Sequence, residues 1–248
     1  MKEILARLDE RKARLDAARP LPPGVVAKLK EYFDVEWTYH SNAIEGSTLT
    51  LAETRLVVLD GLTVGGKSLR EHLEAINHQH AIDFVEALAA KVEPITGHNV
   101  RQIHALILRA IDDENAGAYR KGQVYITGST YVPPVAIRVP PLMQELAAWI
   151  NSAEAADLHP VARAAKAHFR LVHIHPFVDG NGRTARLLMN LILLREGYPP
   201  AVVRRERRSE YYDTLDRAHE GDTDPFVTLV AEEAERSLNV WLAAVRAE

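Results

Sequence analysis

Apolar side chains recur every three or four residues along almost the whole chain, a spacing typical of amphipathic α-helices. The spacing predicts a helix over residues 2–17, which ends before the proline-rich stretch RPLPPG. A second helix is expected from about Val25 to Glu45, because Gly46 is the residue type that most often follows a helix C-terminus. Two helices joined by a proline-rich turn are therefore expected at the start of the chain.

Local start signals predict the other helices. Thr50 and Glu53 have the spacing of a capping box, in which each side chain bonds the backbone N–H group of the other. The segment LLMNLILLREG, residues 187–197, is apolar around almost its whole circumference, which predicts a helix buried at the centre of the fold. The remaining helices are expected over 68–91, from Thr96 to about Ile111, from Pro141, from Pro160, over 209–219 and over 225–245.

One segment departs from the helical pattern. QVYITGSTYVPP, residues 123–134, is rich in β-branched and aromatic residues around a Gly-Ser turn, which predicts a β-hairpin. A single hairpin is marginally stable in water, so this one would have to pack against the helices. The predicted fold class is all-α, a helical bundle around a buried central helix with one β-hairpin flap.

Composition limits the expected binding partners and cellular location of the protein. The formal net charge of -4 gives no general attraction to nucleic acid or to an anionic membrane, so a phosphate-binding site must be local. The chain has no cysteine, which excludes disulfides and thiolate metal ligands. It starts with a charged amphipathic helix rather than a signal peptide, and no apolar run has membrane-spanning length. A cytoplasmic protein is the expectation.

A short glycine-rich segment matches a nucleotide-binding pattern without its context. GLTVGGKS, Gly61 to Ser68, satisfies the phosphate-loop pattern G-x-x-x-x-G-K-[ST]. That loop belongs to a parallel sheet of alternating strands and helices, which the rest of the chain does not supply. We interpret the segment as a turn between two helices, with Lys67 in solvent.

The strongest chemical pattern is HPFVDGNGRTAR, residues 175–186, directly before the buried helix. It places Arg183 and Arg186 in the first turn, although a helix N-terminus already carries partial positive charge and unpaired N–H groups. An anion is therefore expected there. The Gly-Asn-Gly turn at 180–182 can curl into a nest of N–H donors, because glycine allows the backbone to approach a ligand closely.

Two more residues of this stretch complete a site for phosphoryl or nucleotidyl transfer. Asp179 stands where a carboxylate can hold Mg²⁺ that also contacts phosphates, and His175 is suited to abstract a proton near neutral pH. A β-hairpin would need an alternation that the following residues lack, and surface arginines would leave the dipole uncompensated. A metal site of His168, His173 and His175 is a weaker alternative, because no carboxylate accompanies them at helical spacing.

This stretch resembles the signature of the Fic family, H-x-F-x-[DE]-G-N-G-R-x-x-R, at every specified position. Members of that family use Mg²⁺ and transfer AMP from ATP to a hydroxyl side chain of a target protein. The resemblance implies that His175 deprotonates a Ser, Thr or Tyr of the target and that Asp179 holds the metal. The ATP-binding residues that it implies within the signature are Asp179, Gly180, Asn181, Gly182, Arg183, Thr184, Ala185 and Arg186, with both arginines on the β- and γ-phosphates.

The resemblance extends beyond the signature and implies further nucleotide contacts. These are Thr127, Gly128, Ser129 and Thr130 in the flap, Tyr211 and Tyr212 along the adenosine pocket, and His219, which stands where close relatives can have an asparagine. The implied domain organisation is an N-terminal helical region over 1–95 and a catalytic core with C-terminal helices over 96–248.

Glu45 is a second charge placed against a helix dipole, because it lies in the last turn of its helix. The two anomalies would cancel if Glu45 paired with Arg186. SNAIEG, residues 41–46, resembles the inhibitory motif [ST]-x-x-x-E-[GN] of class II Fic proteins at Ser41, Glu45 and Gly46. The resemblance implies autoinhibition in cis by a helix over about 36–46, whereas a solvated helix end is the simpler alternative.

The expected function is protein adenylyltransfer, with removal of AMP at the same site or nucleotide binding without turnover as alternatives. The hairpin, about 123–132, is expected to offer a strand edge to an extended segment of the target protein. Self-modification and a homodimer remain open. The basic run RRERR, 204–208, is interpreted as a solvated face, and no binding of nucleic acid is expected.

Overall fold

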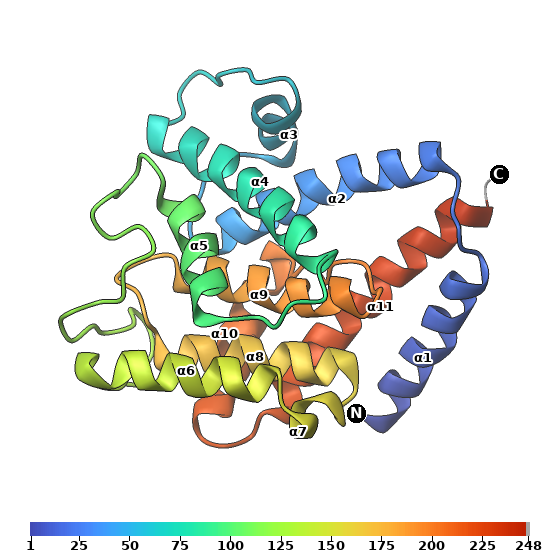
Figure 1. Ribbon diagram of the computed structural model, residues 1–248. Helices are drawn as coiled ribbons and strands as arrows, with labels where there is room; N and C mark the ends of the chain where they lie inside the picture. Colours follow the sequence, from blue (N-terminus) through green and yellow to red (C-terminus); the bar gives the residue numbers. More distant parts are fainter. Residues whose placement is uncertain (247–248) are drawn as a thin grey trace.

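The computed structural model describes residues 1–246, and all regular elements in that range are helices, with no strand (Figure 1). The α-helices are α1 (Lys2–Ala17), α2 (Pro23–Ile44), α3 (Leu51–Leu59), α4 (Leu69–Ala89), α5 (Gly97–Leu108), α6 (Val139–Ile150), α7 (Ala153–Ala156), α8 (Pro160–Ile174), α9 (Asn181–Arg195), α10 (Arg208–His219) and α11 (Asp224–Arg246). Two short 3₁₀ turns, η1 (Ala136–Arg138) and η2 (Arg205–Arg207), precede α6 and α10. The prediction of an all-α fold is confirmed.

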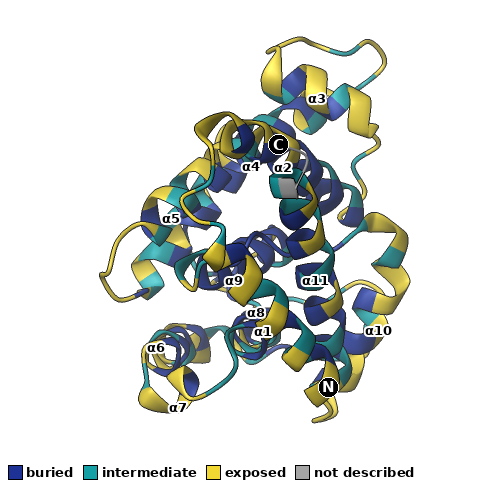
Figure 2. Ribbon diagram, turned by 90° about the vertical axis from the view of Figure 1, so that its right-hand side faces the viewer, coloured by how far each residue is buried: buried dark blue, intermediate teal, exposed yellow. Residues whose placement is uncertain are grey.

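Helix α9 is the centre of the bundle, as the sequence predicts. Every residue over 183–193 is buried, and α8, α4 and α5 pack around it (Figures 1 and 2). A helix surrounded on all sides cannot be amphipathic, which explains why residues 187–193 are apolar around almost the whole circumference. The loop between α8 and α9 therefore leads directly into the core of the molecule.

The predicted inhibitory segment, about 36–46, forms the C-terminal end of a helix that packs against α9. Helix α2 contacts α4, α9 and α11, and its C-cap is Glu45. Gly46 follows with a positive φ of 108°, a left-handed conformation that glycine adopts without strain. The α2 terminus is thus held at a defined position beside the start of α9.

The glycine-rich segment 61–68 forms the turn between two helices that the sequence predicts, between α3 and α4. Residues 51–59 are the helix α3, which starts with the predicted capping box between Thr50 and Glu53. Lys67, expected in solvent, donates to the Thr48 carbonyl and lies 3.3 Å from a Glu53 carboxylate oxygen. The expectation of a solvated Lys67 is wrong, because the lysine closes the turn back onto the start of α3.

The predicted β-hairpin over 123–132 is absent, so the flap prediction is wrong. Residues 123–134 form an irregular loop, called the flap loop below, with a turn at Gly128 and a hydrogen bond from Ser129 N to Ile126 O at 3.2 Å. Its side chains bond to helices instead, as when the Tyr131 hydroxyl donates to His173 O at 2.9 Å. A two-stranded ladder gains little in water, and the prolines at 133–134 supply no N–H donors to it.

One continuous apolar core runs from α1 to α11. Leu8 and Leu15 of α1 are fully buried against the C-terminal helix, and Arg7 Nε pairs with a Glu235 oxygen at 2.8 Å. The division at residue 95 stays a prediction. None of the helices within 1–246 is both long and apolar enough to cross a membrane.

Candidate active site

The loop between α8 and α9 is held by buried polar contacts. His175 ends α8 with a left-handed φ of 50°, and Gly180 starts α9 with a φ of 75°. The Asn181 side chain turns back to bond Phe177 N and O, both at 3.0 Å. Asn181 therefore stabilises the loop and does not point its amide at a ligand.

Two residues that the sequence analysis missed hold this loop from behind. His104 Nδ1 accepts from Gly117 N, so its Nε2 donates to Asp179 O at 2.9 Å. Burial lowers the pKa of His104 to about 4, which keeps this tautomer neutral. Arg120 Nε donates to His175 O at 2.8 Å. Neither residue lies within the signature, and only the tertiary structure brings them to it.

The His175 imidazole has the protonation state that a general base needs. Its Nδ1 lies 3.4 Å from Val172 O, which assigns the proton to Nδ1 and leaves the Nε2 lone pair available. Burial lowers the pKa of His175 from its ordinary value, so the ring is neutral at pH 7. A neutral imidazole at the mouth of a helix can accept a proton from an alcohol.

His175 opens onto a cavity of about 360 Å³ between the flap loop, α8, α10 and the end of α2. The predicted site residues that line it are Glu45, Thr127, Ser129, His175, Asp179, Gly182, Tyr211, Tyr212 and His219. Residues that the sequence analysis missed also line it: Tyr125, Ile126, Val172, Arg208, Leu215 and Asp216. The structure thus brings the predicted base, the inhibitory glutamate and part of the predicted nucleotide site together in one cleft.

Other predicted site residues do not line this cavity. Gly128, Thr130, Gly180 and Asn181 are not among its walls, and Thr184 and Ala185 are fully buried behind it. Helix α9 starts at Asn181, so Arg186 lies in its second turn rather than its first. The signature therefore combines residues that face the cleft with residues that pack the helix beneath it.

Arg186 is almost completely buried and contacts the end of α2. Its Nη2 donates to Glu45 Oε1 at 2.8 Å and to Ser41 O at 2.8 Å, while its Nε donates to Ser41 Oγ at 3.0 Å. A Cβ at position 182 would collide with Glu45 Oε1, so Gly182 is required for this approach. The structure brings the two charges together and places the Glu45 carboxylate between Arg186 and the cavity.

Tyr211 binds Arg186 from the opposite side. Its hydroxyl accepts from Arg186 Nη1 at 3.2 Å and donates to His168 Nε2 at 2.9 Å. His168 is fully buried, and burial lowers its pKa well below the ordinary value. This contact makes His168 part of the support of Arg186.

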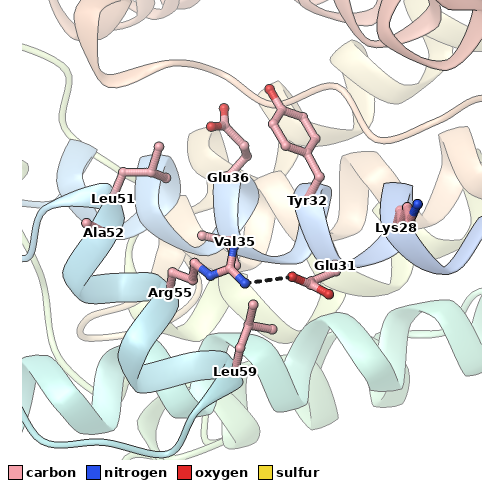
Figure 3. Close-up of a pocket in the computed structure, with 9 residues that line it drawn as sticks. All are labelled: Lys28, Glu31, Tyr32, Val35, Glu36, Leu51, Ala52, Arg55 and Leu59. Carbon is pink, nitrogen blue, oxygen red and sulfur yellow. Dashed lines mark hydrogen bonds and ion pairs between the residues drawn. The ribbon is translucent and has the colours of Figure 1, made fainter. Parts of the chain in front are cut away.

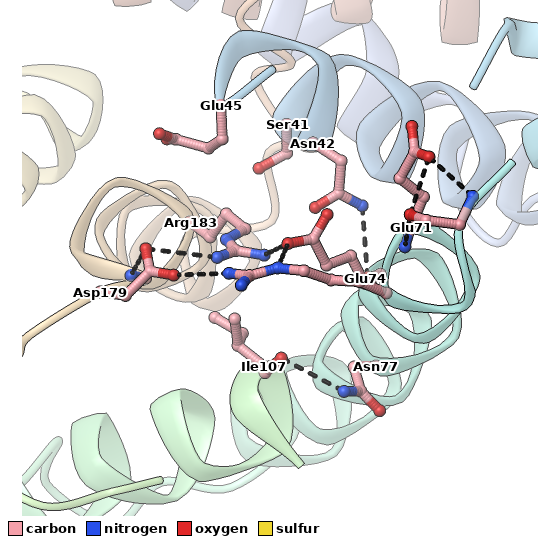
Figure 4. A network of polar contacts seen from close by, with 12 residues as sticks. Ser41, Asn42, Glu45, Glu71, Glu74, Asn77, Ile107, Asp179 and Arg183 are labelled. Carbon is pink, nitrogen blue, oxygen red and sulfur yellow. Dashed lines mark hydrogen bonds and ion pairs between the residues drawn. The ribbon is translucent and has the colours of Figure 1, made fainter. Parts of the chain in front are cut away.

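Arg183 points to a different partner from Arg186. Figure 4 shows its guanidinium between Glu74 of α4 and Asp179, with N–O distances of 3.3 and 3.6 Å. Arg70 of α4 bridges the same two acids at 3.1 and 3.0 Å. Arg183 is only 3% exposed, so Glu74 compensates a charge that would otherwise be buried alone.

The donor set at Asp179 fits a magnesium ion. The carboxylate is about half exposed at the cleft, and its oxygens accept from Gly180 N and from Arg70. Mg²⁺ in nucleotide sites usually takes one or two carboxylate oxygens and completes its shell with phosphates and water. Within residues 1–246 no three His, Asp or Glu side chains gather as a metal site, the three histidines included.

The flap loop is fixed to α10 by aromatic and polar contacts. The Tyr131 ring stacks on His219 at 3.7 Å between centroids, and Ser129 Oγ donates to Asp216 at 2.7 Å. His219 Nδ1 lies 3.1 Å from His173 Nδ1, and burial lowers the pKa of His219 to about 4. His219 therefore packs the loop in addition to lining the cleft.

The basic run 204–208 is a solvated face only in part: Arg205, Glu206 and Arg208 are exposed, whereas the other two arginines pair with a buried carboxylate. Arg207 and Arg204 both pair with Glu233, which is 1% exposed on α11. Arg205 Nη1 donates to the Tyr39 hydroxyl of α2 at 2.9 Å. A buried carboxylate needs cations beside it, and the run supplies them.

A second cavity, of about 350 Å³, lies between α2 and α3 (Figure 3). Its walls are largely apolar, and an ion pair between Arg55 and Glu31 at 3.1 Å crosses it. No residue of the 175–186 stretch lines it. The chemistry of the signature therefore belongs to the cleft at His175.

Comparison with known proteins agrees with this geometry. The pattern of the Fic/DOC family matches residues 94–193. The protein adenylyltransferase Fic of Drosophila willistoni is 42% identical over 241 residues, which cover 97% of this chain and 48% of that protein. Its counterpart in Drosophila persimilis is 41% identical over 251 residues, 98% of this chain and 49% of that protein. The chain thus spans about half the length of the curated relatives it matches.

Solved structures share the whole fold. A fragment of Fic-1 from C. elegans is 33% identical with a TM-score of 0.91, and the match covers 99% of this chain and 73% of that one. A Fic domain containing signaling protein from Bacteroides thetaiotaomicron is 31% identical with a TM-score of 0.90 and coverages of 99% and 98%. Similarity of sequence and fold over nearly the full length establishes that this chain belongs to the Fic/DOC family.

Proposed function

We propose that the protein transfers AMP from ATP to the hydroxyl of a Ser, Thr or Tyr in a target protein. The observation that carries the proposal is the neutral His175 in the same cleft as the start of α9 and the Glu45–Arg186 pair. The names of the curated relatives support it. A base and a helix N-terminus in one cavity, with a buried guanidinium behind the Glu45 carboxylate, suit nucleotidyl transfer.

The His175 imidazole performs the proton transfer. Its Nε2 takes the proton of the target hydroxyl as that oxygen attacks the α-phosphorus of ATP. A phosphoester bond forms, the bond from the α-phosphorus to the bridging oxygen breaks, and pyrophosphate leaves. The first-turn N–H groups of α9, including that of Gly182 in the cleft, have no partners within the helix and bind phosphate oxygens.

The other cleft residues bind the nucleotide. Arg186 binds the distal phosphates once Glu45 withdraws, and Tyr212 and Thr127 face the nucleoside. Asp179 would hold Mg²⁺, which neutralises phosphate charge when bound. Arg183 takes part through Asp179 and Glu74 and does not project into the cavity in this state.

Glu45 restrains the activity in cis. Its carboxylate satisfies Arg186 and adds a negative charge where the triphosphate must bind. Two like charges in one partly buried site repel each other, so ATP has to displace Glu45 from Arg186. This is the inhibitory role that Ser41, Glu45 and Gly46 suggest.

The target protein binds along the flap loop. Tyr125 and Val132 are more than half exposed there, and Tyr125 also lines the cleft. An extended segment laid over 123–132 brings its hydroxyl toward His175. If a segment of a second copy of this chain lies along the same loop, the chain would modify itself.

The deciding experiment incubates the Glu45→Gly variant with ATP, Mg²⁺ and a cell lysate and searches tryptic peptides by mass spectrometry. The expected result is a mass gain of one AMP on hydroxyl residues, absent when His175→Ala is added. A variant that binds ATP but adds no AMP to itself or to any lysate protein would refute the transfer activity and leave a nucleotide-binding protein.

The same geometry supports removal of AMP as a second candidate. Glu45 and His175 line one cavity, and the Glu45 carboxylate is about a third exposed, so it can orient a water molecule. Incubating AMP-modified protein with the wild-type chain tests it. Release of AMP that requires Glu45 is the expected sign of this reaction.

A further inference from the structure

Arg208 is the member of the basic run 204–208 that enters the cleft. It is the first residue of α10 and lines the cavity with Glu45 and His175. Each of the other three arginines of the run has a carboxylate within 4 Å, whereas no such ion pair involves Arg208 in the described part of the chain. An unpaired guanidinium facing a cavity is a binding group for an anion.

The guanidinium of Arg208 is held in place by one of its nitrogens. Its Nε donates to Ile44 O at 2.8 Å, and its Cζ lies over the Tyr212 ring, 4.9 Å from the ring centroid. Arginine has five N–H donors, so the Nη1 and Nη2 groups keep donors for a ligand. A side chain already fixed at one end loses little freedom when a ligand binds the other.

Arg208 and Arg186 both contact the end of α2. Arg186 Nη2 bonds Glu45 Oε1 directly, while Arg208 bonds the carbonyl of the preceding residue, Ile44. When the Glu45 side chain leaves, its negative charge leaves with it, while Arg186 stays at the end of α2 and Arg208 stays in the wall of the same cavity. The space then suits a group with several anionic oxygens better than one carboxylate.

We propose that Arg208 binds the distal phosphates of the nucleoside triphosphate together with Arg186. The inference rests on the proposed function in taking ATP as the ligand. It adds a phosphate-binding residue from outside the 175–186 stretch, contributed by the start of α10 beside the end of the inhibitory helix.

Nucleotide affinity measured by calorimetry tests this role. The Glu45→Gly protein is titrated with ATP and with AMP in the presence of Mg²⁺, alone and combined with Arg208→Ala or Arg208→Lys. Charged hydrogen bonds contribute enough that Arg208→Ala should weaken ATP binding by about ten- to one-hundredfold. AMP, which lacks the distal phosphates, should change by less than about twofold, and Arg208→Lys should fall between because it keeps charge without the planar fork.

Arg205→Ala is the matched control. Arg205 belongs to the same run but bonds Tyr39 and does not line the cleft, so ATP affinity should stay unchanged. Equal losses for ATP and AMP after Arg208→Ala, with the melting temperature preserved, would overturn the proposal and assign Arg208 to packing of Tyr212 and α2. Unchanged ATP affinity would overturn it as well.

The result separates this inference from the proposed function. If the Glu45→Gly protein itself binds no ATP, the proposed function fails and the phosphate role falls with it. If that protein binds ATP and adds AMP to targets while Arg208→Ala has no effect on affinity, the inference alone is refuted.

Discussion

Replacing Glu45 by glutamine separates the charge of the inhibitory residue from its size. The Arg186 partner is 2% exposed, and it keeps hydrogen bonds to Ser41 O, Ser41 Oγ and Tyr211 when the charge is lost. Two unit charges about 4 Å apart attract by about 4 kcal/mol at an effective dielectric of 20. Glu45 is about a third exposed and glutamine still accepts from Arg186, so the net loss should be about 1–2 kcal/mol.

Weakening the Glu45–Arg186 contact should lower the stability of the protein and raise its rate of AMP labelling. The melting temperature should fall by about 2–8 °C, because about 1 kcal/mol shifts a domain of this size by about 2–4 °C. AMP labelling from fluorescent ATP should rise about tenfold, since about 1.4 kcal/mol corresponds to a factor of ten. Glu45→Gly, which also empties the space, should label faster still.

Glu220→Gln is the matched control for this experiment. Glu220 is also the C-cap of its helix, α10, and it is exposed without an ion pair within residues 1–246, so neither quantity should change. A Glu45→Gln protein that melts lower but labels no faster would show that the contact is structural and not inhibitory. If neither the melting temperature nor the labelling rate changes, the charge of Glu45 does not stabilise its contact with Arg186 as calculated above.

Three further outcomes are expected. His175→Ala in the Glu45→Gly background should abolish labelling while calorimetric ATP affinity stays within about twofold, because the ring moves a proton and holds no phosphate. Since burial lowers the pKa of His175, the labelling rate of Glu45→Gly should decline in acid with a midpoint below the ordinary histidine value near 6.5; a midpoint at or above that value would contradict it. Glu74→Gln leaves Arg183 buried without its main counter-charge and should lower the free energy of unfolding by about 2–4 kcal/mol in denaturant titrations, whereas Arg70→Ala, at an exposed pair, should cost at most about 1 kcal/mol.

The helices could be predicted because their signals are local. The capping box at Thr50, the glycine at position 46 and the apolar circumference of 187–197 act within a few turns of chain, and the structure has a helix start, a helix end and a buried helix at these places. The flap could not be predicted in the same way. Its β-branched residues indicate extended backbone, but a strand exists only where a partner strand completes the hydrogen bonds.

The misread charges have a common cause. Lys67 and the run 204–208 were expected in solvent because a charge usually lies there, yet Glu53 and the buried Glu233 pair with Lys67 and with two arginines of the run. Glu74, which compensates Arg183, is more than one hundred residues away in sequence. No spacing rule links such partners, because the distance between them is set by how α3, α4 and α11 pack.

The sequence by itself determined the helical class, the family signature at 175–186 and the placement of Arg183 and Glu45 at helix ends whose dipoles oppose their charges, since each depends on residues close together in the chain. Only the tertiary structure decided which charges meet: Arg186 with Glu45, Arg183 with Glu74, and Arg208 with the cleft. The physical reason is that a buried charge is stable only beside its counter-charge, and which helix supplies it follows from packing of the whole bundle.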